Sequence, residues 1–171
     1  MKKMLVLTLL FFGSSVFASG GVNIYSGFSY LPGAEYRFAD SSTVSTGTLF
    51  GTNLGLMKIF GNNFIIGASI EGVLGKIKDK YNWADWTDSI TLEADGGYRF
   101  GFQMPVDVYA ILGYRWAKLN TAHSTGPGYG AGIAVNIESL RPVIEYTFFK
   151  MNVDGLKYDD SRITFDLDFT K

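Results

Sequence analysis

The sequence contains no cysteine and only one histidine, His123. The absence of cysteine excludes disulfides, thiolate metal sites, cysteine nucleophiles and the lipid-acceptor residue of a lipoprotein. One histidine without cysteine is a poor basis for a metal site, so we expect neither a metal nor another cofactor. The formal net charge is only −1, which gives nucleic-acid binding no electrostatic support.

Long hydrophobic runs are also missing, except at the N-terminus. There, residues 5–12 are apolar, follow two lysines and precede a small-x-small sequence that ends at Ala18. This order is typical of a secretory signal peptide, and the run is too short to cross a bilayer as a helix. We expect residues 1–18 to be a cleaved signal peptide and residues 19–171 to form one domain. An uncleaved N-terminal membrane anchor is the alternative.

No later stretch shows a helical period with caps; the dominant period is two. In residues 88–100, for example, apolar residues such as Leu92 alternate with polar ones such as Glu93. Side chains along a strand point alternately to its two sides, so this pattern predicts β-strands. It occurs in eight segments, at about 21–30, 46–60, 63–75, 88–100, 106–118, 127–137, 140–150 and 161–170.

The connections between these segments alternate in length. Three are short (GNN, GFQMP and ES), and four are longer (LPGAEYRFADSSTVS, KIKDKYNWADWTD, LNTAHSTG and MNVDGLKYDD). In an up-and-down meander, alternate connections lie at the same end, so the short ones share one end with both chain termini. Short periplasmic turns opposite longer external loops are typical of transmembrane barrels.

Volume predicts which side of each strand faces inward. An eight-stranded barrel is just wide enough to be filled by side chains, and the apolar side is too large and too aromatic to fit. The other side is small, polar and rich in glycine, which leaves room for its arginines. A continuous apolar exterior suits a bilayer and would aggregate in water. The predicted fold is therefore all-β: an eight-stranded antiparallel up-and-down transmembrane β-barrel, closed because lipid cannot satisfy a sheet edge.

Two groups of architectural residues follow from this orientation. A charge network is expected in the lumen, either as a polar plug or as a narrow, cation-favouring pore; its members are Glu71, Glu93, Asp95, Arg99, Asp107, Arg115, Arg141, Glu145, Arg162, Asp166 and Asp168. Aromatic residues near the strand ends are expected at the two membrane interfaces; they are Tyr30, Phe60, Phe64, Tyr98, Phe100, Trp116, Phe148 and Phe169.

The signal sequence, the eight alternating strands, the short turns at one end and the closing RITFDLDFTK together resemble the small outer-membrane β-barrel family. This is the group of the OmpA transmembrane domain, OmpX and the opacity-type adhesins. The resemblance implies a monomer in the outer membrane of a Gram-negative bacterium, in contact with membrane lipids and lipopolysaccharide. It also implies that the assembly machinery reads the C-terminal strand, in which Ile163, Phe165, Leu167 and Phe169 alternate and Thr170 and Lys171 follow.

The leading functional prediction is a structural or surface-interaction protein, adhesin-like, whose long loops face the exterior. Tyr81, Trp83 and Trp86, in a lysine-rich loop, are candidates for contact with lipopolysaccharide phosphates or a host or cell-surface ligand; extension of the aromatic belt is the alternative. No enzyme is expected, because His123 and Ser124 are adjacent loop residues without a nearby acid. The alternatives are a narrow porin-like channel, a lipid A-modifying enzyme and a soluble lipocalin-like binder.

Overall fold

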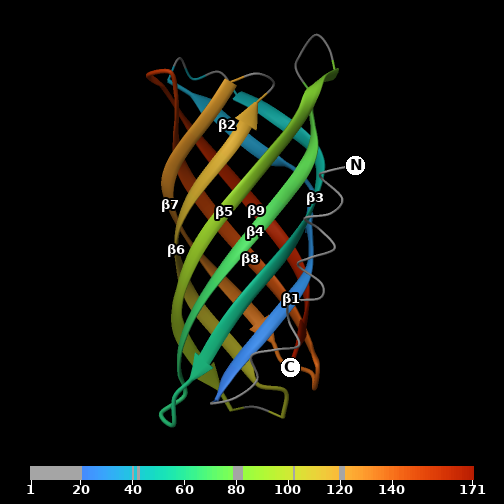
Figure 1. Cartoon of the computed structure of the whole chain (residues 1–171), viewed down its shortest axis with the longest axis vertical. Helices are drawn as coiled ribbons and strands as arrows, with labels where there is room; N and C mark the ends of the chain where they lie inside the picture. Colours follow the sequence, from blue (N-terminus) through green and yellow to red (C-terminus); the bar gives the residue numbers. More distant parts are fainter. Residues whose placement is uncertain (1–20, 40, 42, 79–82, 102, 120–121) are drawn as a thin grey trace.

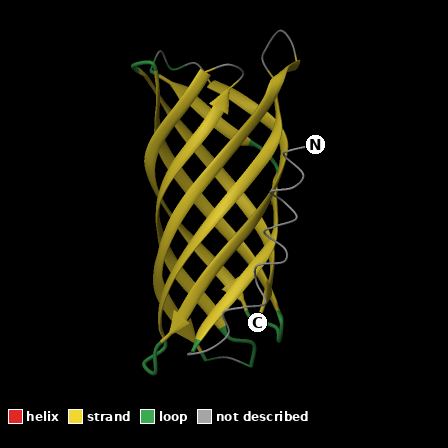
Figure 2. Ribbon diagram, viewed as in Figure 1, coloured by secondary structure: helices red, strands yellow, loops and turns green. Residues whose placement is uncertain are grey.

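The computed structural model describes residues 21–39, 41, 43–78, 83–101, 103–119 and 122–171; the predicted signal peptide lies outside these residues. All regular structure in the described chain is β-strand (Figure 2), and no described helix is long and apolar enough to cross a membrane. The strands are β1 Val22–Leu31, β2 Ala34–Phe38, β3 Thr43–Ile59, β4 Phe64–Lys78, β5 Trp83–Phe100, β6 Val106–Leu119, β7 Ala122–Val135, β8 Leu140–Val153 and β9 Leu156–Thr170.

The strands close into one antiparallel barrel (Figure 1). From β3 to β9 each strand pairs with the next along the chain, and the last one, β9, pairs with the first. Strands β1 and β2 both pair with β3 on one side and β9 on the other, so they are two segments of a single barrel strand. This strand is interrupted at Pro32 and Gly33, because proline cannot donate to the ladder. The predicted eight-stranded up-and-down barrel is confirmed.

The three short connections lie together at the lower end of Figure 1, with the C-terminus. They join β3 to β4, β5 to β6 and β7 to β8. The first is a tight turn in which the N–H of Phe60 donates to the carbonyl of Phe64 at 2.9 Å, and Asn63 adopts a positive φ of 65°. The predicted grouping of the short turns at one end is confirmed.

The four longer connections lie at the opposite end, as predicted, but their described residues are mostly strand rather than loop. Strand β2 occupies the middle of the first one, and β8 and β9 are joined by Asp154 and Gly155 alone. Their φ values of 49° and 88° are those of a two-residue hairpin turn. The strands extend because the alternation of side chains continues beyond the segments that the sequence analysis assigned.

The apolar side of each strand faces outward, as predicted. Leu112, Leu92 and Ile133 are 69%, 47% and 46% exposed, whereas Glu93 is 9% and Arg115 is 1% exposed. A membrane strand needs about 9–11 residues, but β5 has 18 and β3 has 17. The strands of the barrel are therefore longer than the thickness of a bilayer requires, and part of the barrel extends beyond its apolar band.

Above the apolar band the two sides exchange character. On β8, Phe149 and Met151 point inward and are 0% and 1% exposed. Lys150 and Asn152, which alternate with them, point outward and are exposed. Tyr36 of β2 and Tyr158 of β9 are buried in the same way. This upper part, with its polar exterior and apolar interior, is built like a water-soluble sheet. We call it the upper stem.

Several lumen glycines make space for rings. A side chain at Gly128 would stand 2.4 Å from the ring of Phe149, one at Gly132 would stand 2.4 Å from the ring of Tyr109, and one at Gly55 would stand 2.2 Å from the ring of Tyr25. The expectation that the glycines leave room for arginines is therefore corrected: at these positions they accommodate aromatic side chains.

Candidate functional site in the barrel lumen

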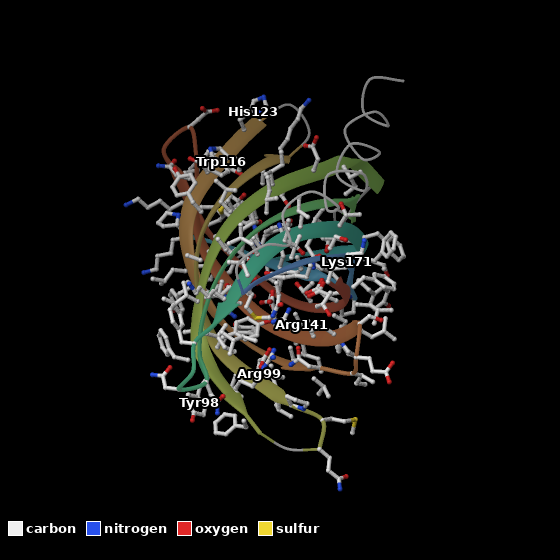
Figure 3. All side chains as sticks on the ribbon, turned by 60° about the horizontal axis from the view of Figure 1, so that its bottom comes forward. Tyr98, Arg99, Trp116, His123, Arg141 and Lys171 are labelled. Atoms are coloured by element: carbon white, nitrogen blue, oxygen red, sulfur yellow. The ribbon has the colours of Figure 1, made fainter. Side chains whose placement is uncertain are left out.

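The lower lumen contains an arginine–aspartate layer. Arg99 on β5 donates from Nε and Nη2 to the two carboxylate oxygens of Asp107 on β6, at 2.6 and 2.8 Å. Asn136 completes the group: it accepts from Arg99 at 3.0 Å and donates to Asp107, also at 3.0 Å. The bidentate geometry fixes both side chains, because guanidinium and carboxylate are matched planar groups. Figure 3 shows Arg99 near the end of the barrel that carries Tyr98.

A second pair lies beside this layer. Arg141 on β8 donates to Asp168 on β9 at 2.8 Å, and Asp168 also accepts from Asn53 at 2.9 Å. The guanidinium of Arg141 lies 5.1 Å from the ring centre of Tyr25 and 5.4 Å from that of Tyr109. Two aromatic faces and one carboxylate thus surround a nearly buried cation, an arrangement that compensates part of its desolvation.

The upper layer is organised by Asp160, which is fully buried. Arg162 donates to both of its carboxylate oxygens, at 2.9 and 2.8 Å, and Arg115 donates to one of them at 3.1 Å. Two buried guanidinium groups therefore share one carboxylate. Their remaining donors reach uncharged oxygens: Arg115 donates to Thr91 at 2.9 Å, and Arg162 donates to Ser89 at 3.0 Å.

An apolar cluster lies in the lumen at the level of this layer and above it. The centre of the Phe149 ring lies 3.8 Å from the guanidinium carbon of Arg115. Phe149 therefore links the charged layer to the cluster. We call this cluster the apolar plug; it comprises Leu31, Ala34, Tyr36, Leu49, Val73, Ala117, Phe149, Met151 and Tyr158, all buried.

Between the two arginine layers lie acidic residues without arginine partners. Glu71, Glu93, Asp95, Glu145 and Asp166 form no ion pair with any described residue. Their hydrogen bonds to described side chains are few: Ser69 contacts Glu93 at 3.4 Å, and Tyr109 donates to Glu145 at 2.6 Å. We call these five residues the central carboxyl belt.

All eleven residues of the predicted lumen network lie on the inward side of their strands, and the structure brings six of them into ion pairs. These six are Arg99, Asp107, Arg115, Arg141, Arg162 and Asp168. Sequence reasoning missed Asp160, because it placed this residue in a loop. The signal was present: Asp160 continues the inward alternation of Arg162, Thr164, Asp166 and Asp168 toward the N-terminus of β9.

The aromatic residues predicted for the membrane interfaces lie on the outer surface. Phe60, Phe64, Tyr98, Phe100, Trp116, Tyr30 and Phe169 are between 39% and 46% exposed, and Phe148 is half-buried against Tyr129. Figure 3 shows Tyr98 and Trp116 toward opposite ends of the barrel. Their contact with the two membrane interfaces stays a prediction.

The predicted loop contacts are only partly visible. Tyr81 lies outside the described residues, and the side chains of Trp83 and Trp86 do as well, although the backbone of both belongs to β5, where it pairs with Lys78 and Lys76 of β4.

His123 and Ser124 lie on β7, not in a loop, and point to opposite faces. His123 is exposed, while the hydroxyl of Ser124 is buried and hydrogen-bonded to Tyr158 at 2.7 Å. Adjacent strand residues on opposite faces cannot form a nucleophile–base pair.

These features define the class of protein: the fold is that of the eight-stranded outer-membrane β-barrels. No family model matches the chain, and neither does any curated protein. Among solved structures, the chain is similar to Ail, the attachment invasion locus protein of Yersinia pestis, with a TM-score of 0.55 at 14% identity over 88% of this chain and 100% of that one. Neisserial surface protein A gives a TM-score of 0.55 at 12% identity, over 88% of this chain and 97% of that one. OprG from Pseudomonas aeruginosa gives a TM-score of 0.51 at 9% identity, over 89% of this chain and 96% of that one.

Proposed function

We propose that this protein is a monomeric barrel of the Gram-negative outer membrane, sealed through its lumen, with a structural or surface-interaction role. In this proposal residues 1–18 direct export and are removed. The observation that carries it is the combination of an outward apolar band with the apolar plug. The band requires lipid around the barrel, and the plug argues against a role in solute passage. The upper stem, which this proposal places outside the cell, then remains as the part that meets other molecules.

The sealed lumen is testable by planar-bilayer recording of the refolded protein. Because Leu49, Phe149 and Met151 fill the upper lumen with buried hydrocarbon, we expect no steady conductance from the wild type. Replacing all three with alanine removes the plug and should produce measurable conductance. Leu112→Ala, on the lipid-facing side, is the matched control and should stay silent. Steady conductance of the wild type would overturn the sealed barrel.

A narrow cation channel is the second candidate, and one observation favours it. The described lumen contains eight carboxyl groups but only four guanidinium groups, so any water path through it would attract cations. The same recording separates the two proposals: conductance that requires Glu93 and Glu145 supports the channel.

We propose that the stem's outer surface binds the surface ligand. Its exposed positions carry charges of both signs. In the sheet register, Asp159 of β9 lies opposite Arg37 of β2 on one side and opposite Lys150 of β8 on the other. The structural neighbour Ail is named for attachment and invasion, and one of its structures contains the heparin analogue sucrose octasulfate. For this chain, the exposed basic residues are the candidate contacts for sulfated or phosphorylated sugars, lipopolysaccharide included.

Cell adhesion to a heparin-coated surface tests this role. Cells that display the wild type should bind more than cells without it, and the Arg37→Glu/Lys150→Glu/Lys157→Glu variant should lose the difference. Lys58→Glu, at the opposite end of the barrel beside Phe60, is the matched control and should bind like the wild type. Equal binding by all strains would refute the adhesive role.

The C-terminal strand is the proposed contact for the outer-membrane assembly machinery. Ile163, Phe165, Leu167 and Phe169 present one apolar row on the outer face of β9, with exposures of 41% to 46%. Because β9 closes the barrel against β1, its recognition before closure would couple targeting to folding. Deleting Phe169 should reduce assembled barrel in cells more than it reduces refolding in detergent.

A further inference from the structure

Lys58 is a charged residue within the apolar outer surface of the barrel. It is exposed and lies on the outward side of β3 between Leu56 and Phe60, which are 53% and 39% exposed. In the sheet register it stands opposite Val22 of β1 on one side and opposite Ile66 of β4 on the other. Residues opposite one another share a face of the sheet, so four apolar side chains surround this lysine.

No acidic side chain of the described chain compensates this cation. Lys58 forms no ion pair with any described residue, and the adjoining turn, residues 60–64, has no charged residue in its sequence. Lys118 on β6 differs, because it stands opposite Asp88 of β5. A cation on a lipid-facing strand is tolerated where its charge reaches the headgroups, so we look for the partner of Lys58 in the lipid.

The ammonium group of Lys58 lies beside an aromatic pair at the short-turn end. Its Nζ is 5.4 Å from the centre of the Phe60 ring. The rings of Phe60 and Phe64, both exposed, have their centres 6.3 Å apart. A lysine in this setting keeps its stem along apolar surface and its charged head at the interface, where aromatic residues also gather. The charge is therefore at the level of the lipid headgroups.

We propose that Lys58, with Phe60 and Phe64 beside it, binds the headgroup of an anionic phospholipid in the leaflet nearest the short turns. The ammonium donates to the phosphate oxygens, a charge-assisted contact, while Leu56, Val22 and the other apolar neighbours meet the acyl chains. A headgroup with net negative charge is favoured over a zwitterionic one, because the ammonium of a zwitterion competes for the same phosphate. The proposal rests on the proposed function for the bilayer around the barrel and for the periplasmic side of this leaflet.

Native mass spectrometry of the refolded barrel tests the site, with an equimolar mixture of phosphatidylglycerol and phosphatidylethanolamine that carry the same acyl chains. The wild type should retain phosphatidylglycerol over phosphatidylethanolamine by about fivefold, as expected from the attraction of one lysine to an anionic surface. Lys58→Gln should lose most of this preference, and Lys58→Arg should keep it. Lys157→Gln makes the same charge change on the upper stem, where Lys157 is exposed, and should behave like the wild type.

Inorganic phosphate distinguishes a lipid site from a site for free phosphate. Excess phosphate at constant ionic strength should leave the phosphatidylglycerol bound, because the apolar contacts hold the lipid. Displacement of the lipid by phosphate would overturn the proposal, and so would equal retention of the two lipids by the wild type. These two measurements need no variant, so the test survives a substitution that prevents folding. A preference that persists in Lys58→Gln would also overturn it.

Failure of the proposed function would look different. Steady bilayer conductance of the wild type would overturn the sealed barrel and leave the lipid preference unchanged. Reversed accessibility of the two barrel ends in intact cells would overturn the orientation and move the site to the outer leaflet. The site lies at the end of the barrel opposite the upper stem, so substitutions of Lys58 should leave cell adhesion unchanged.

Discussion

At the scale of single residues, Asp160 has the largest consequence for stability. It is the only described carboxylate in ion-pair contact with Arg115 and Arg162, which are 1% and 2% exposed. Asp160→Ala leaves two buried guanidinium groups unpaired, and removing one partner of a buried pair costs about 3–5 kcal/mol. We expect this loss in the free energy of unfolding, measured by urea titration of the barrel in lipid.

A neighbouring aspartate supplies the control for this prediction. Asp159 points to the outer face of the same strand and forms no ion pair with any described residue; even exposed ion pairs contribute only about 0–1 kcal/mol. Asp159→Ala should therefore change the unfolding free energy little. Equal costs for the two variants would show that the upper arginine layer is not held by Asp160.

The glycine at position 128 is the second residue whose role is specific. Its missing side chain gives room to the ring of Phe149, which would stand 2.4 Å from an added Cβ. Gly128→Ala should destabilise the barrel by about 1–3 kcal/mol, the usual cost of overpacking a core. Combining it with Phe149→Leu should recover part of the loss, because the smaller side chain vacates the contact. Gly61→Ala, with nothing within 4 Å, is the control.

At the scale of elements, β8 shows what the sequence could predict and what it could not. The alternation identified its apolar outward row, including Ile144 and Tyr146, because lipid requires such a row. The same alternation continues to Phe149 and Met151, but there the large apolar residues take the inward side. The predicted strand was identified by its lipid-facing apolar row and therefore ended at residue 150. In the structure the strand continues to Val153.

The change of environment along β8 leads to a test on one strand. Ile144 and Asn152 point to the same outer side and are both exposed, but only Ile144 belongs to the apolar band. Arginine at a lipid-facing barrel position costs about 2–4 kcal/mol at mid-membrane and about 0–1 near the interface. Ile144→Arg should therefore reduce insertion into vesicles strongly, and Asn152→Arg should not. Matching losses would mean that the stem is embedded in lipid.

At the scale of the whole molecule, the sequence predicted the barrel better than its interior. Closure, strand number and facing follow from alternation, which is local. The pairing of Arg115 with Asp160, 45 residues later, depends on how distant strands are staggered, and no local pattern contains that information. The excess of acidic over basic residues in the lumen was predictable from composition. Its separation into two paired layers and an unpaired belt was not, because that also depends on the stagger of the strands.

The orientation of the whole barrel gives the last prediction. Because the sequence has no cysteine, single cysteines can be placed at the two ends and in the band, as Lys157→Cys, Asn62→Cys and Ile144→Cys. A membrane-impermeant maleimide should label Lys157→Cys in intact cells, since this residue is exposed on the stem. Asn62→Cys, in the short turn between β3 and β4, should react only after the outer membrane is permeabilised, and Ile144→Cys only after unfolding. Labelling of Asn62→Cys but not Lys157→Cys in intact cells would reverse the assigned orientation.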